Sequence, residues 1–65
     1  MNNPLTKREL QIVELLADGL NAKDISERLH ISVETVHSHK KNMLFKSDSK
    51  NSVMLVAQCI KNGLI

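Results

Sequence analysis

The sequence predicts an all-α domain built from four helices. Three observations carry this prediction: apolar residues recur at spacings of three and four, good N-cap residues precede the first three such stretches, and loop-forming residues separate the stretches. At 65 residues the chain forms one domain, which is too small for a deep catalytic cavity. Its one cysteine, Cys59, allows no disulfide within the chain, so helix packing must hold the fold together.

The first helix is expected to begin after Thr6, because Thr6 and Glu9 are spaced as in a capping box. Leu5 and Leu10 flank this cap and are placed to form a hydrophobic staple. Gly19 ends the helix, because glycine adopts the left-handed conformation of a helix C-terminus without a Cβ clash. The apolar stripe of this helix is expected to comprise Leu10, Val13, Leu16 and Ala17.

Two further helices follow with a short connection between them. Asn21 caps a helix that ends near Leu29, and Ser32 caps a longer helix over residues 33–46. Two helices joined by about three residues have the spacing of a helix-turn-helix. In the longer helix we expect Val36, Met43 and Leu44 to face the core and His37, Ser38, Lys41 and Phe45 to face elsewhere.

The fourth helix is expected to run from about Asn51 to 62 and to end at Gly63, after a polar loop at residues 47–50. Seven of the eight residues 53–60 are apolar, which is more than one core-facing stripe requires. A helix that is apolar nearly all round indicates a second protein surface. We expect one face, with Leu55, Val56 and Cys59, to close the core, and a dimer interface to be formed by Val53, Met54 and Ala57.

The charge of the chain is unevenly distributed. Residues 1–34 carry four lysine or arginine and six aspartate or glutamate side chains, whereas residues 35–65 carry five and one. A basic surface confined to one part of a molecule is typical of a protein that binds a polyanion. A lysine-rich face that is merely solvated would give the same counts, so charge alone leaves that alternative open.

Several classes of function are not expected. The longest apolar run, residues 53–57, is far shorter than the roughly 20 residues of a membrane span, and no charged leader precedes an apolar segment, so we expect a cytoplasmic protein without a membrane partner. His37 and His39 would point about 200° apart on a helix and cannot share a metal ion. Cys59 is expected to be an inert core residue. No motif indicates an enzyme, a cofactor or a small-molecule substrate.

Residues spread almost from end to end of the chain form a specific pattern: Leu5, Thr6, Arg8, Glu9, Gly19, Ile25, Leu29, Ser32, Thr35, Val36, His39, Asn42, Lys46, Leu55 and the closing residues 62–65. This pattern resembles the LuxR-type (GerE- or FixJ-type) helix-turn-helix domain of bacterial transcription regulators. The resemblance implies four helices, of which the second is a scaffold, the third is a recognition helix and the fourth commonly mediates dimerisation. It also implies an output domain, here residues 5–65, that usually follows a phosphoacceptor or sensing domain, and residues 1–4 are expected to be a linker or a disordered N-terminus.

By position in this family, the base edges of DNA would be contacted by His37, Ser38 and Lys41, whose side chains can donate or accept the hydrogen bonds that bases offer. Phosphate contacts, which position the protein without reading sequence, are expected from Asn21, Lys23, Thr35, His39, Lys40 and Lys46. We also expect His39 to be half-buried, because it follows the core residue Val36 by three positions. The implied partners are double-stranded DNA, a second copy of the chain on paired half-sites, and RNA polymerase as a further candidate.

The chain departs from the family at Ser47, Asp48 and Ser49, where leucine, glycine and valine are usual. The recognition helix is therefore expected to end with less buried anchoring, and Phe45 is the candidate to supply the missing apolar contact. Two alternatives remain. A helical module could bind another regulator without binding DNA, and a sigma-factor type of helix-turn-helix would need RNA polymerase, although the closing residues match the LuxR type better.

Overall fold

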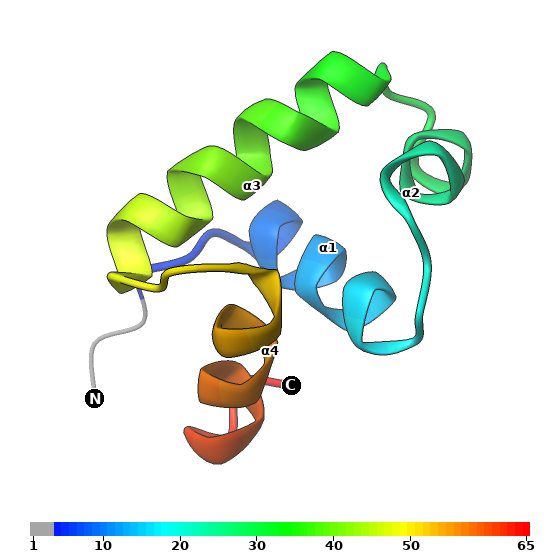
Figure 1. The fold of residues 1–65 in the computed structure, drawn as a ribbon. Coiled ribbons are helices and arrows are strands. Elements are labelled where there is room, and N and C mark those ends of the chain that lie inside the picture. Colours follow the sequence, from blue (N-terminus) through cyan, green and yellow to red (C-terminus); the bar gives the residue numbers. More distant parts are fainter. Residues whose placement is uncertain (1–3) are drawn as a thin grey trace.

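The computed structural model describes residues 4–65, and within that range it contains four helices: α1 (Lys7–Ala17), α2 (Ala22–Leu29), α3 (Val33–Ser47) and α4 (Ser52–Lys61). The predicted all-α class is confirmed, and each helix lies within a residue or two of its expected bounds. In Figure 1, α3 runs along the upper edge of the molecule. Helix α2 lies beside the N-terminal end of α3, and α1 and α4 lie below α3. Residues 1–3 of the predicted linker are outside the described range.

Each helix begins at a capping side chain, and the sequence indicated those of α1, α2 and α3. Thr6 Oγ1 accepts from the Glu9 amide at 3.1 Å, and Glu9 Oε1 accepts from the Thr6 amide at 2.8 Å, which completes the predicted capping box. The cap of α2 is also reciprocal, through Asn21 and Asp24. Ser32 and Asn51 cap α3 and α4 through the amides three residues later, at 3.0 and 2.8 Å.

The core lies where the inner faces of the four helices meet. Its fully buried side chains are Ile12, Val13, Ile25, Val36, Met43 and Leu55. The predicted stripe of α1 is partly wrong: Leu10 and Leu16 are half-buried and Ala17 is exposed, whereas Ile12 is fully buried. Apolar residues cover a broad arc of α1, so its contacts with α3 and α4 decide which of them face inward.

Helices α2 and α3 each end at a left-handed residue other than glycine. His30, between α2 and α3, has φ 58°, and Asp48, after α3, has φ 54°, so both backbones are left-handed. Residues with a Cβ adopt this conformation at a cost, which is smaller for aspartate because its short polar side chain can form local hydrogen bonds. Helices α2 and α3 are therefore each ended by a single left-handed residue.

The loop after α3 is anchored by hydrogen bonds rather than by apolar contacts. Ser47 Oγ donates to the Met43 carbonyl at 2.7 Å and lies 2.8 Å from Ser49 Oγ. Ser49 Oγ in turn donates to Gln58 Oε1 of α4 at 3.2 Å. The expectation that Phe45 supplies the missing apolar contact is wrong, because that side chain is exposed. The polar loop sequence instead connects α3 to α4 through its own hydroxyls.

Candidate nucleic-acid interface

The outer face of α3 is uncovered by the other helices. Because successive residues of a helix are rotated by about 100°, Glu34, Ser38, Lys41 and Phe45 fall within about 60° of one another, opposite the buried Val36. All four are exposed, and His37, also exposed, flanks them. The three predicted base-contacting residues therefore share one accessible surface along the edge that α3 forms in Figure 1.

The predicted phosphate-contacting residues are divided between two helices. On α3, Thr35 is exposed and its hydroxyl lies 2.8 Å from that of Ser32, while His39 and Lys40 are half-buried, as expected for His39. Asn21 and Lys23 are exposed at the start of α2, and the hydrogen bonds of Asn21 stay within that helix. The predicted phosphate-contacting residues therefore lie partly at the start of α2 and partly on α3.

Lys46 has a partner that the sequence did not predict. Its Nζ lies 2.6 Å from Glu9 Oε1, and the side chains are 34% and 4% exposed, respectively. The same Glu9 oxygen accepts from the Thr6 amide, so one carboxylate both caps α1 and binds the last turn of α3. The two residues are 37 positions apart, and no local pattern relates them.

The charge of Glu9 is stabilised where it lies. Burial by itself would raise the pKa of this carboxyl, because it removes water from the charged form. The hydrogen bonds from Lys46 and Thr6, together with the positive charge of Lys46, outweigh burial and leave the pKa of Glu9 below its usual value. Glu9 is therefore ionised at neutral pH and holds the end of α3 against the start of α1.

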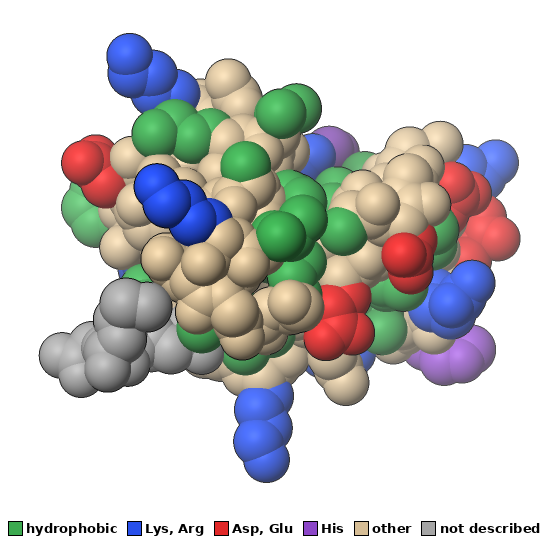
Figure 2. All heavy atoms as spheres, turned by 90° about the horizontal axis from the view of Figure 1, so that it is seen from below, with side chains coloured by type: hydrophobic (Ala, Val, Ile, Leu, Met, Phe, Trp, Pro, Cys, Tyr) green, Lys and Arg blue, Asp and Glu red, His purple; other side chains and the backbone are tan. Residues whose placement is uncertain are grey.

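A second uncovered surface lies on α4 and is apolar. Val53 is 80% exposed, Met54 37% and Ile60 58%, and Ala57 is exposed as well, whereas Leu55 and Cys59 are buried. The predicted division of α4 into a core face and an exposed face is confirmed. Ile60 was missed, although its spacing of seven from Val53 places it on the same stripe. Figure 2 shows hydrophobic side chains gathered on the side of the molecule where α4 projects.

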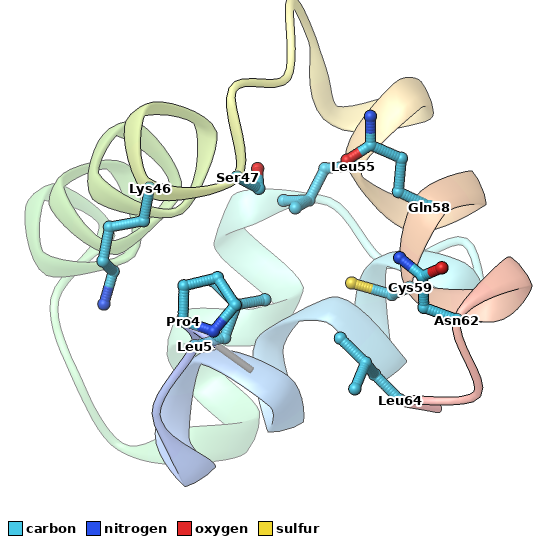
Figure 3. Close-up of a pocket in the computed structure, with 9 residues that line it drawn as sticks. All are labelled: Pro4, Leu5, Lys46, Ser47, Leu55, Gln58, Cys59, Asn62 and Leu64. Atoms are coloured by element: carbon cyan, nitrogen blue, oxygen red, sulfur yellow. The ribbon is translucent and has the colours of Figure 1, made fainter. Parts of the chain in front are cut away.

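A small pocket of about 220 Å³ lies between the N-terminal segment, the end of α3 and α4 (Figure 3). Cys59 lines it, and burial raises the pKa of this thiol, which keeps it protonated at neutral pH. None of the lining side chains is a histidine or a carboxylate that could activate it: Pro4, Leu5, Lys46, Ser47, Leu55, Gln58, Asn62 and Leu64. The pocket therefore does not assemble an activated nucleophile.

Residues 4–65 contain neither a candidate metal site nor a candidate membrane span. Over residues 4–65, no group of three or more histidine, cysteine, aspartate or glutamate side chains is arranged to hold a metal ion. No helix in that range has the length and apolar character needed to cross a membrane.

The chain is similar in sequence to bacterial regulatory proteins. The sequence model described as "Bacterial regulatory proteins, luxR family" matches residues 3–58. The chain is 44% identical over 61 residues to the oxygen regulatory protein NreC of Staphylococcus haemolyticus and 41% identical over 61 residues to NreC of Staphylococcus carnosus. It is 37% identical over 62 residues to the uncharacterized transcriptional regulatory protein YxjL of Bacillus subtilis. These alignments cover 94–95% of this chain but 28% of each relative, so the chain spans little more than a quarter of their length.

Proposed function

Since the chain belongs to the LuxR family of bacterial regulatory proteins, we propose that it is the sequence-specific DNA-binding domain of a transcription regulator. The observation that carries this proposal is the uncovered outer face of α3, which presents His37, Ser38 and Lys41 on a helix fixed by the preceding α2. The proposal assigns no catalytic step to this domain.

In this proposal α3 enters the major groove, which is wide enough to admit a helix. Lys41 donates to guanine O6 or N7, Ser38 donates or accepts, and His37 can do either through its two ring nitrogens. Contacts to phosphates fix the register of the helix on the duplex, and the side chains proposed for them are Asn21, Lys23, Thr35, His39, Lys40 and Lys46. The Nζ of Lys46 keeps donors for a phosphate beyond the one used on Glu9, and its side chain is partly exposed.

We further propose that two copies bind paired half-sites through the apolar face of α4. Val53, Met54 and Ala57 are exposed without any contribution to the core, and Ile60 extends their surface. This face is small, so pairing of the free domain is weak and becomes firm on DNA, where two linked contacts reinforce each other. In a longer protein of the length of NreC, the remaining chain would supply further contacts. Such a regulator works in the cytoplasm, and RNA polymerase is the further partner we propose for it.

Selection of bound sequences from a random duplex pool tests the proposal. We expect enrichment of two related half-sites about one helical turn apart. The logarithm of the affinity for the enriched duplex should fall linearly with the logarithm of salt concentration, with a slope of about 0.9 per phosphate contact, because binding releases counterions. A module that binds only another protein would enrich no sequence and show no such slope, and that result would overturn the proposal.

A further inference from the structure

Phe45 is the most exposed large apolar side chain of the described chain, at 87%. It is also the chain's only phenylalanine, and the sequence contains no tyrosine or tryptophan. An aromatic ring left in water forgoes the stabilisation that burial of its apolar surface would give. No other helix covers Phe45, and the core is closed without it. The fold therefore gives no reason for a phenylalanine at this position.

The position of Phe45 on α3 relates it to the proposed DNA-reading residues. It follows Lys41 by four residues and Ser38 by seven, so the three side chains form one stripe. At a rise of about 1.5 Å per residue, Phe45 lies about 6 Å beyond Lys41 along the helix, within the width of about 12 Å of a major groove. Aromatic side chains on a helix also lean toward its N-terminus, which brings the ring back toward the turn of Lys41.

We propose that Phe45 contacts the 5-methyl group of a thymine and thereby specifies a T·A pair beside the pair read by Lys41. The thymine methyl is the apolar feature that base pairs present in the major groove, where the other exposed groups donate or accept hydrogen bonds. The neighbours of Phe45 on the outer face are polar or charged, namely Ser38, Lys41 and Asn42. An isolated ring among polar side chains matches the major groove, which is polar and offers a single methyl group at a thymine. An apolar protein surface would instead require several apolar side chains around the ring. This inference rests on the proposed function and adds a specificity-determining residue to it.

Replacement of individual thymines by deoxyuridine in the selected duplex tests the inference, because it removes the methyl group and nothing else. We expect one thymine in each half-site at which this replacement weakens binding of the natural chain about fourfold, the loss for one methyl group. The F45A variant should bind both duplexes equally at that position. K41A is the matched control, since it weakens binding but should keep the fourfold preference for thymine.

The outcomes separate this inference from the proposed function. If no duplex is enriched, DNA binding itself fails. If DNA is bound but no thymine shows a methyl preference that depends on Phe45, the inference is wrong and DNA binding stands. Unchanged DNA affinity of F45A would also overturn it, and would direct attention to a protein partner for the ring. F45A should melt at the same temperature as the natural chain, because the ring makes no contact with the core.

Discussion

The outer faces of α3 and α4 are equally accessible, yet their chemistry is opposite. The face of α3 presents His37, Ser38 and Lys41 with a single aromatic ring, whereas the face of α4 presents Val53 and Ile60 with almost no polar group between them. The core needs neither set, since it is closed by the inner residues of both helices. The exposed side chains of α3 and α4 lie outside the core. Their chemistry is what distinguishes the proposed surface for a polyanion from the proposed surface for another protein.

The largest effect is expected when a charge is placed on the apolar face of α4, which removes part of its difference from the polar face of α3. Val53→Asp places a charge on the apolar face of α4, at a residue more exposed than Met54 and so less involved in packing. We expect cooperative filling of paired half-sites to be lost, with a fall in affinity for the paired site of about a hundredfold, while a single half-site is bound as before. Gel-shift titration on paired and single half-sites measures both quantities.

Val53→Lys is the matched control for this experiment. It also places a charge in the interface, but one that DNA attracts. Both variants should lose cooperativity if the face pairs two copies. If only the aspartate variant loses it, the effect is repulsion from DNA, and the assignment of this face to dimerisation is wrong.

The next effect sharpens the role of the α3 face. Lys41→Ala should weaken binding to the selected site by roughly 1–3 kcal/mol and binding to random duplexes much less, because it removes a donor to a base edge. Competition titrations with the two kinds of duplex give the two values. Equal losses would move Lys41 to the group of phosphate contacts and would leave base reading to His37 and Ser38.

Lys46 tests whether a side chain at the margin of the α3 face serves DNA, the fold or both. Lys46→Met keeps the aliphatic stem and removes the charge. We expect it to lower the free energy of unfolding by about 1–3 kcal/mol, since the buried Glu9 loses its partner, and to reduce the salt slope of DNA binding by about 1. Thermal unfolding and binding at several salt concentrations measure these two effects separately.

Glu9→Gln is the control, because it removes the buried charge and leaves Lys46 in place. It should lower stability without changing the salt slope. The pKa of Glu9 is lowered in the folded chain, so its charge contributes stability above the unfolded-state pKa, about 4.3, and this contribution is lost as pH falls through the lower folded value. The glutamine variant should lack that part of the acid dependence. Loss of stability in Lys46→Met with an unchanged slope would exclude a phosphate contact.

Two substitutions outside both faces should have small effects on stability and serve as a reference for the larger effects. Thr6→Ala should cost about 1 kcal/mol of stability through loss of the cap of α1, a fall in melting temperature of about 4–8 °C, with DNA affinity unchanged while the domain is folded. A variant with unaltered melting would show that the cap contributes nothing.

The smallest effect is expected at the end of α3. Asp48→Gly should raise stability by about 0.5 kcal/mol, because glycine adopts the left-handed backbone of this position without a Cβ clash. The gain is limited because glycine also has more conformational freedom in the unfolded chain. Calorimetry measures the difference, and a fall in stability would indicate that the Asp48 side chain supports the loop.

The parts of the structure that the sequence predicted are governed by local interactions. The caps at Thr6, Asn21 and Ser32 bind amides three residues away, so their chemistry is visible in a short window of sequence. The outward positions of α3 likewise follow from helix periodicity, because its polar and apolar residues alternate at that period.

The features that were missed depend on distant contacts. The salt bridge between Glu9 and Lys46 joins α1 to α3, and the hydrogen bond between Ser49 and Gln58 joins the loop after α3 to α4. No local spacing in the sequence predicts either interaction. The inward face of α1 was misjudged because several of its apolar residues could equally have faced the core. Packing against the neighbouring helices buries Ile12 and leaves Ala17 exposed, and helix periodicity alone does not predict this.

The separation of the two sides of α3 has a consequence for how such a domain changes over evolutionary time. Val36 and Met43 hold the helix from within, whereas Ser38, Lys41 and Phe45 face outward and contribute little to folding. Substitutions at such exposed positions usually alter stability by no more than about 0.5 kcal/mol. If these outward residues read the operator, as we propose, duplicated copies of the gene can acquire different operator preferences through a few changes on one helix face, without passing through an unfolded intermediate.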